Sequence, residues 1–82
     1  MSPKFPAITD REVIKVAKKL GFIFYRQAKG SHEIWYRIKD SRYTTIPRHS
    51  GKIIKRKTLK AIMEDFNVSP EEFRELLTKK SK

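Results

Sequence analysis

The sequence of 82 residues predicts an α+β fold: one helix, a three-stranded antiparallel meander, and then two more helices. Three observations predict it. Apolar residues recur at helical spacing near both ends of the chain, aromatic and β-branched residues fill its middle, and short polar turns divide that middle part. Short connections between strands favour hairpins, and helices on either side of a meander pack best as a second layer on one sheet face.

The first helix is predicted between Thr9 and Gly21. Thr9 is a capping residue, and Glu12 follows at the third helical position, where its carboxylate can bond back to the cap. Gly21 suits the left-handed residue that ends a helix. Residues 1–7 contain two prolines and no periodicity, so we expect a flexible arm before the helix.

The predicted strands are Phe22–Gln27, His32–Ile38 and Tyr43–Ile46. Polar turns separate them, and Pro47 ends the third because proline cannot donate to a strand ladder. Side chains of the second strand alternate, so His32 shares a face with Ile34 and Tyr36. We expect that face to be the one the helices cover, which makes Tyr36 a core residue. Trp35 then lies on the opposite face.

Two helices complete the fold. The first is predicted to begin between Ile54 and Thr58 and to end at Asn67. The second repeats the capping pattern of the first helix, with Ser69 as cap. We expect residues 1–82 to form a single domain with a core of about residues 8–77 and flexible ends at 1–7 and 78–82.

The charge of the chain is strongly positive and uneven. Lys and Arg number 20 against 9 Asp and Glu, a net charge of +11. Residues 1–63 carry 16 basic and 4 acidic side chains, whereas residues 64–82 carry 4 and 5. This balance favours a polyanionic partner, with nucleic acid first and an acidic protein second. The chain has no cysteine and no apolar run long enough to span a membrane, so we expect a cytoplasmic protein.

The turn Lys29-Gly30-Ser31-His32 is the first candidate site. His32 is a candidate acid or base, and the glycine lets a phosphate or base approach closely. Nearby Arg26 and Lys29 are candidate phosphate binders, and Trp35 could stack on an unpaired base. Two histidines and scattered acids supply a metal site poorly, so we expect neither a metal nor another cofactor.

A second group of candidates follows the third strand. Arg48 and His49 stand in the loop Pro47–Gly51, which could bind phosphate or simply cap the next segment. The densest basic run in the chain comes next, where a helix amino end favours anions. Its phosphate-binding candidates are Lys52, Lys55, Arg56 and Lys57.

Taken together, these motifs resemble the HicA family of bacterial and archaeal toxins. The motifs, which occur in the order of that family over about residues 8–73, are Leu20-Gly21-Phe22, Arg26-Gln27, Gly30-Ser31-His32, Pro47-Arg48-His49-Ser50-Gly51 and Lys57-Thr58-Leu59-Lys60-Ala61-Ile62. The resemblance implies a fold like a double-stranded RNA-binding domain. It also implies a ribonuclease that cleaves messenger RNA and is neutralised by a HicB-type antitoxin.

The resemblance also assigns roles. The essential histidine of the family maps onto His32, whereas His49 carries over only as a site candidate. We expect His32 to act by metal-independent acid–base chemistry, with Lys29, Arg26 or Arg48 stabilising charge and Ser31 orienting the phosphate. Two other readings stay open. One is a non-catalytic RNA-binding module of the same fold, and the other is an adaptor whose basic face binds only an acidic protein.

Overall fold

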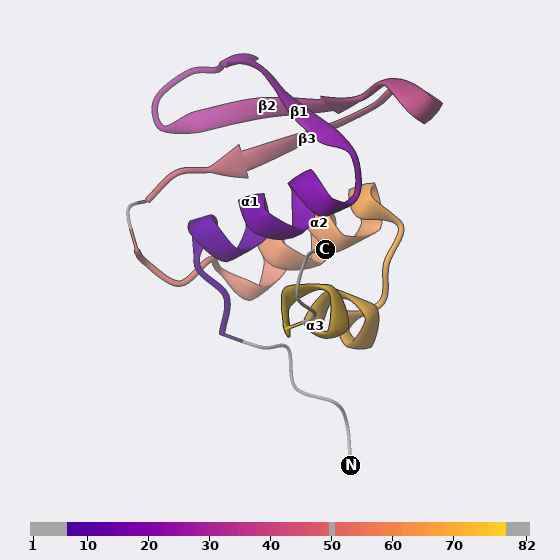
Figure 1. Cartoon of the computed structure of the whole chain (residues 1–82). Helices are drawn as coiled ribbons and strands as arrows, with labels where there is room; N and C mark the ends of the chain where they lie inside the picture. Colours follow the sequence, from indigo (N-terminus) through magenta and orange to yellow (C-terminus); the bar gives the residue numbers. More distant parts are fainter. Residues whose placement is uncertain (1–6, 50, 79–82) are drawn as a thin grey trace.

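The computed structural model describes residues 7–49 and 51–78 (Figure 1). Its elements are α1 (Asp10–Lys19), β1 (Phe22–Gln27), β2 (His32–Arg37), a 3-10 turn (Ile38–Asp40), β3 (Arg42–Pro47), α2 (Arg56–Phe66) and α3 (Pro70–Thr78). This order confirms the predicted α+β fold. The ends predicted to be flexible lie outside the described residues, except for the exposed Ala7 and for Thr78, which is the last residue of α3.

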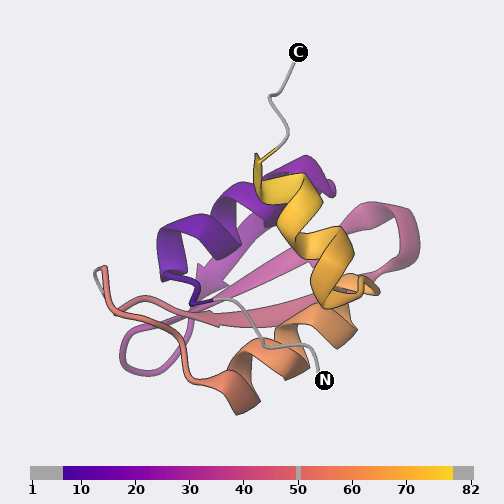
Figure 2. The same ribbon diagram turned by 90° about the horizontal axis from the view of Figure 1, so that it is seen from below.

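The three strands form an antiparallel sheet in the order β1-β2-β3. Helices α1 and α2 lie side by side against one face of this sheet, as predicted (Figures 1 and 2). Helix α3 packs against α1 on the side away from the sheet and therefore does not join that layer. None of the described helices lies on the opposite face of the sheet (Figure 1). No helix within the described residues is long and apolar enough to cross a bilayer.

Local signals in the sequence fix where the helices begin and end. The Thr9 hydroxyl accepts from the Glu12 amide, and the Glu12 carboxylate accepts from the Thr9 amide at 2.9 Å. Ser69 and Glu72 make the same reciprocal pair before α3, at 3.1 and 2.8 Å. Gly21 follows α1 with φ +92°, a conformation that costs glycine little. The predicted caps are confirmed.

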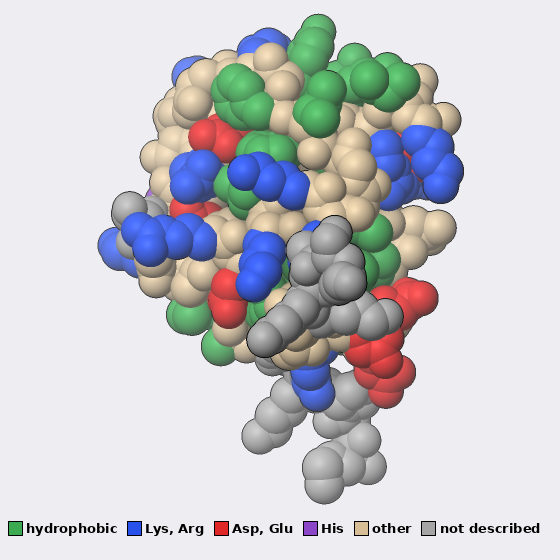
Figure 3. All heavy atoms as spheres, viewed as in Figure 1, with side chains coloured by type: hydrophobic (Ala, Val, Ile, Leu, Met, Phe, Trp, Pro, Cys, Tyr) green, Lys and Arg blue, Asp and Glu red, His purple; other side chains and the backbone are tan. Residues whose placement is uncertain are grey.

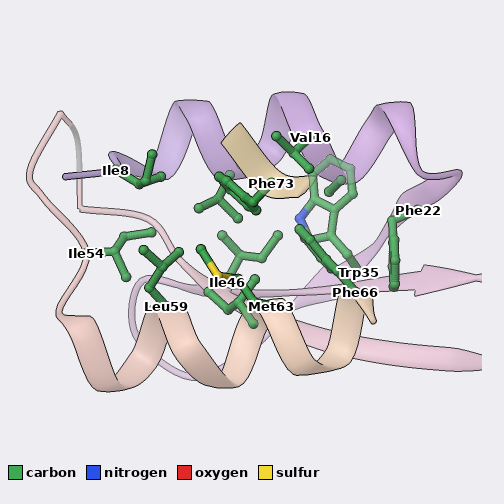
Figure 4. Close-up of a cluster of buried hydrophobic side chains, with 13 residues drawn as sticks. Ile8, Val16, Phe22, Trp35, Ile46, Ile54, Leu59, Met63, Phe66 and Phe73 are labelled. Atoms are coloured by element: carbon green, nitrogen blue, oxygen red, sulfur yellow. The ribbon is translucent and has the colours of Figure 1, made fainter. Parts of the chain in front are cut away.

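The core fills the space between the sheet and the helices, where α1, α2 and α3 all contribute side chains (Figure 4). Phe22 and Phe66 meet at a ring-centroid distance of 5.0 Å, and Phe66 stacks on Phe73 of α3 at 6.3 Å. Phe73 is fully buried, so α3 covers the core on the side away from the sheet. The same core holds α1 and α2 in place beside β3.

The prediction of which sheet face is covered was wrong. Trp35 is only 5% exposed and points into the core between the helices (Figure 4), whereas Tyr36 lies on the open face. The Trp35 indole donates to Glu33 at 3.0 Å and meets Phe24 edge-on. Alternation shows which residues share a face, but both faces of β2 carry large apolar side chains. Trp35 is therefore a core residue and is not exposed to stack on a base.

The second strand ends one residue earlier than predicted. Ile38 belongs to the 3-10 turn, and Ser41 leaves that turn with φ +54°. Asp40 bonds to Arg37 at 2.9 Å and pairs with Arg42 at 3.3 Å. Hydrogen bonds and charge from these arginines lower the pKa of Asp40 to about 2, against the smaller opposing effect of desolvation. Asp40 is therefore ionised at neutral pH and paired with both arginines.

Candidate active site

A tightly bonded turn presents His32 at the start of β2. The Ala28 amide donates to the His32 carbonyl at 2.8 Å and closes the hairpin. The Gln27 side-chain amide donates to the carbonyls of Gly30 and His32, at 3.3 and 3.1 Å. Gly30 has φ +66° with open space where a Cβ would lie. The backbone of this turn is thus held in place while its outer side stays open.

The imidazole of His32 is exposed and oriented by one contact. Its Nδ1 lies 3.3 Å from the carbonyl oxygen of Lys29. A carbonyl oxygen only accepts, so Nδ1 carries the proton in this contact. In the neutral ring, Nε2 then has a free lone pair. This tautomer is the one that a general base needs.

The loop that begins at Pro47 lies directly beside this turn. His32 pairs with Pro47 in the sheet, and the Arg48 amide donates to the Ser31 carbonyl at 2.8 Å. The antiparallel pairing of β2 and β3 therefore brings together two motifs that are separated by 14 residues of sequence. It places His49 in the same region as His32.

A cleft of about 410 Å³ opens at this junction. Its polar side chains are His32, His49, Lys52, Lys55 and Thr58, and Pro47, Ile53 and Ile54 form an apolar part of its lining. The cleft borders the start of α2, where Lys55 is the N-cap and no side chain caps the helix. The amide groups of that first turn have no intrahelical acceptor and favour anions. No carboxylate among the described residues lines this cleft.

A second cleft of about 430 Å³ runs along β3 beside α2. It also contains His32, Pro47 and Thr58, so it is continuous with the first. From there it extends past Thr45 to Tyr43 along the strand. Lys57 lies on the α2 side of this second cleft. The two clefts form one groove with His32 at the shared part.

The guanidinium of Arg48 is bonded to two carboxylates. Its Nε donates to the buried Asp10 at 2.8 Å, and its Nη1 bonds to Glu33 at 3.2 Å. Asp10 also accepts from the Gly51 amide at 3.3 Å. These contacts tie the loop after β3 to the start of α1. Arg48 therefore positions the loop that carries His49, and its guanidinium is engaged by carboxylates.

The contacts of Asp10 also set its protonation. Burial disfavours the charged carboxylate, but hydrogen bonds from Arg48 and Gly51 and the charge of Arg48 outweigh it and lower the pKa of Asp10. Because the folded pKa is lower than the unfolded one, the ion pair stabilises the fold above the unfolded pKa. The contribution disappears as the pH falls through the folded pKa.

We expect Asp10→Asn to lower the free energy of unfolding by about 2 kcal/mol at neutral pH, since it leaves Arg48 without its buried partner. The difference from the unaltered protein should begin to shrink below roughly pH 4, where the carboxylate becomes protonated in the unfolded chain, and should vanish only below the lower pKa of the folded protein. Urea unfolding from pH 7 to pH 3 measures both effects. Glu64→Gln, the same change at an exposed position of α2, should cost less than about 0.5 kcal/mol. A gap that is constant down to pH 3 contradicts the assignment.

The structure thus brings together His32, His49, Lys52, Lys55 and Lys57. Of the other candidates, Gly30 and Ser31 belong to the adjoining turn, and Lys29 contributes its carbonyl to His32. Arg26 and Arg56 are exposed and line neither cleft. Thr58 lines both clefts but was missed by the sequence analysis, although it stands inside a family-like motif. No group of three or more His, Cys, Asp or Glu within the described residues could hold a metal ion.

Comparison with protein families gives one match. The model of the family described as "HicA toxin of bacterial toxin-antitoxin" matches residues 11–68. These residues run from the first turn of α1 to the second residue after the end of α2 and include both histidines. A search of curated proteins finds no match.

Proposed function

The chain belongs to the HicA toxin family, and we propose that it is a metal-independent endoribonuclease that cleaves messenger RNA with His32 as catalytic residue. One observation carries the proposal. An oriented, exposed imidazole lies in a cleft that also holds His49, Lys52 and Lys55 and borders an uncapped helix start. This is the set of groups that phosphodiester cleavage by the ribose 2′-hydroxyl requires.

The proposed reaction uses the nucleophile that RNA itself supplies. Nε2 of His32 takes the proton of the 2′-hydroxyl, whose oxygen attacks the adjacent phosphorus. The bond from phosphorus to the 5′-oxygen of the next nucleotide breaks, and that oxygen receives a proton. His49 lines the same cleft and is the candidate donor. The products are a 2′,3′-cyclic phosphate and a 5′-hydroxyl.

Negative charge in the transition state is stabilised by the segment that follows β3 and by the start of α2. Lys52 and Lys55 offer ammonium groups, and the amide groups at the start of α2 add a fixed dipole. We therefore assign the stabilisation of charge on the phosphate to Lys52 and Lys55, which line the cleft, in place of Arg26 and Lys29. The hydroxyl of Thr58 lines both clefts and is available to hold a phosphate oxygen.

We expect the purified protein to cut RNA equally well with and without an excess of EDTA, since none of the proposed steps uses a metal ion. Gel electrophoresis of a labelled RNA of several hundred nucleotides measures this. A non-catalytic RNA-binding module would instead retain the RNA uncut, with an affinity that falls steeply with salt. An adaptor for an acidic protein would show little affinity for RNA. Cleavage that stops in EDTA and returns with a divalent cation contradicts the proposal.

Membership of this family implies a cognate antitoxin, and we propose that it is of the HicB type. The groove at His32 is basic and open, so a protein that covers it and supplies carboxylates would block both RNA binding and proton transfer. We place the protein in the cytoplasm, where it meets messenger RNA. An antitoxin gene beside the toxin gene would support this arrangement.

A further inference from the structure

The open face of the sheet carries a cluster of tyrosines that the proposed chemistry does not use. Tyr25, Tyr36 and Tyr43 have ring-centroid distances of 4.6 to 6.1 Å from one another. Tyr25 and Tyr43 are each about half exposed, at 54% and 51%. Figure 3 shows hydrophobic side chains, coloured green, gathered over the sheet at the top of the view. A contiguous exposed patch of this kind usually marks a binding surface.

The local backbone directs these rings to one side. Tyr36 pairs with Tyr43 across β2 and β3. On β1 the register shifts between Phe24 and Arg26, so Tyr25 is the extra residue of a β-bulge. Bulges re-aim side chains, and here the Tyr25 ring meets both other rings. The cluster is therefore built from all three strands.

The cluster lies on the same sheet face as His32. Alternation along β2 places His32, Ile34 and Tyr36 on one face, and four residues of strand span about 13 Å. The second cleft, which runs along β3, also links His32 to the cluster, because both His32 and Tyr43 line it. An RNA strand that leaves the cleft along the edge strand β3, past Lys57 and Asp65 of α2, therefore reaches Tyr43.

The strands and their turns carry more basic than acidic side chains. Residues 22–47 carry five Lys and Arg but only two acids, Glu33 and Asp40, which gives a net charge of +3. Both acids are paired with arginines. Desolvation and the neighbouring Tyr25 and Tyr36 raise the pKa of Tyr43, so its phenol stays uncharged at neutral pH. Alternation places Glu33 and Arg37 on the covered face with Trp35, whereas the exposed Arg26 pairs with Ile34 of the open face. The open face therefore combines aromatic rings with a cation.

We propose that Tyr25, Tyr36 and Tyr43 form a stacking platform for unpaired bases of the RNA strand whose scissile phosphate lies at His32. This inference rests on the proposed function for its substrate. It implies that the protein binds single-stranded RNA on the open sheet face, although its fold class is known for duplex binding. Stacking tolerates any base, so the platform adds affinity without strong sequence preference.

Binding is measured with the full chain carrying His32→Ala, which prevents cleavage, and a fluorescein-labelled 12-nucleotide RNA of mixed sequence. Tyr36→Ala and Tyr43→Ala are each expected to weaken binding about 5- to 50-fold. Tyr43→Phe keeps the ring and should bind within about twofold of its parent. Ile38→Ala, at an exposed apolar residue outside the ring cluster, should leave binding unchanged. Circular dichroism confirms that each variant is folded.

A second measurement needs no tyrosine substitution. The same RNA with 4-thiouridine is photo-crosslinked to the His32→Ala chain, and peptides from β1, β2 and β3 that contain the tyrosines should carry the label.

Unchanged binding by both alanine variants, or equal losses for Tyr43→Phe and Tyr43→Ala, overturns the proposal. The proposal is also overturned if the alanine variants bind RNA unchanged but are no longer neutralised by the antitoxin, because the open face would then be a protein-binding surface. If the unaltered protein leaves the RNA uncut but RNA binding still depends on the tyrosines, only the proposed ribonuclease activity is refuted.

Discussion

Replacing His32 by alanine is expected to lower the rate of RNA cleavage by about 10²–10⁴-fold, which is the usual contribution of a general acid or base. The imidazole is exposed and its only described hydrogen bond is to the Lys29 carbonyl, so the free energy of unfolding should change by less than about 0.5 kcal/mol. RNA affinity should be nearly retained, since the lysines and tyrosines remain. Initial rates on a labelled RNA, with a thermal melt of each variant, measure the two effects separately.

A matched control removes a positive charge away from the groove. Lys39→Ala lies in the 3-10 turn after β2, at the opposite end of that strand from His32, and should cleave at a rate within about twofold of the unaltered protein. In living cells, the His32→Ala chain should no longer arrest growth. Full activity of the purified His32→Ala protein contradicts the assignment of the catalytic residue. Loss of activity together with unfolding would be uninformative, but the exposed position of His32 makes that outcome unexpected.

Trp35→Ala is expected to lower the free energy of unfolding by about 3–5 kcal/mol, because it removes a large buried ring and leaves a cavity. A domain of this size has about 5–8 kcal/mol in total, so the variant should lose a large part of its stability. Urea unfolding measures the loss. Trp35→Phe keeps most of the apolar volume but loses the hydrogen bond to Glu33, and should cost less than half as much. Had Trp35 been an exposed stacking residue, alanine would weaken RNA binding without changing stability.

Local features of the sequence were sufficient to predict the order of elements. The capping pairs of Thr9 with Glu12 and of Ser69 with Glu72 act within four residues, and their hydrogen bonds form as expected. Gly21 likewise ends α1 through its own backbone conformation. These signals need no information about distant parts of the chain, so a single sequence reveals them.

The covered face of the sheet and the role of Arg48 depend on contacts between distant residues. Alternation placed His32 and Tyr36 together correctly, but the choice of covered face depends on whether α1 and α2 pack best around Trp35 or around the tyrosines. Arg48 is a phosphate-binding candidate from its charge and its loop, but its bond to Asp10, 38 residues away, is formed only by the fold. An acidic residue at a helix start has an ordinary local explanation, because it favours the helix dipole or caps the helix. Nothing local in the sequence therefore indicates that Asp10 pairs with Arg48.

The candidate site was predicted in part for the same reasons. His32 and the basic run before α2 were found by residue type, and the sheet register then joined them at Pro47. Lys29 and Arg26 are close to His32 in sequence but line neither cleft. Thr58 lies in the cleft because it occupies the first turn of α2. A predicted helix start so close to the loop could have indicated that position.

The central claim is that His32 directs attack by the ribose 2′-hydroxyl, and the chemistry of the cut ends tests it most directly. A defined RNA is digested by the purified full chain in EDTA, and both fragments at each cut are examined by mass spectrometry. We expect a 2′,3′-cyclic phosphate on one fragment and a 5′-hydroxyl on the other, and no cut at a position where the 2′-hydroxyl is replaced by hydrogen. Fragments with a 3′-hydroxyl and a 5′-phosphate, or cleavage of the 2′-deoxy position, would contradict the mechanism.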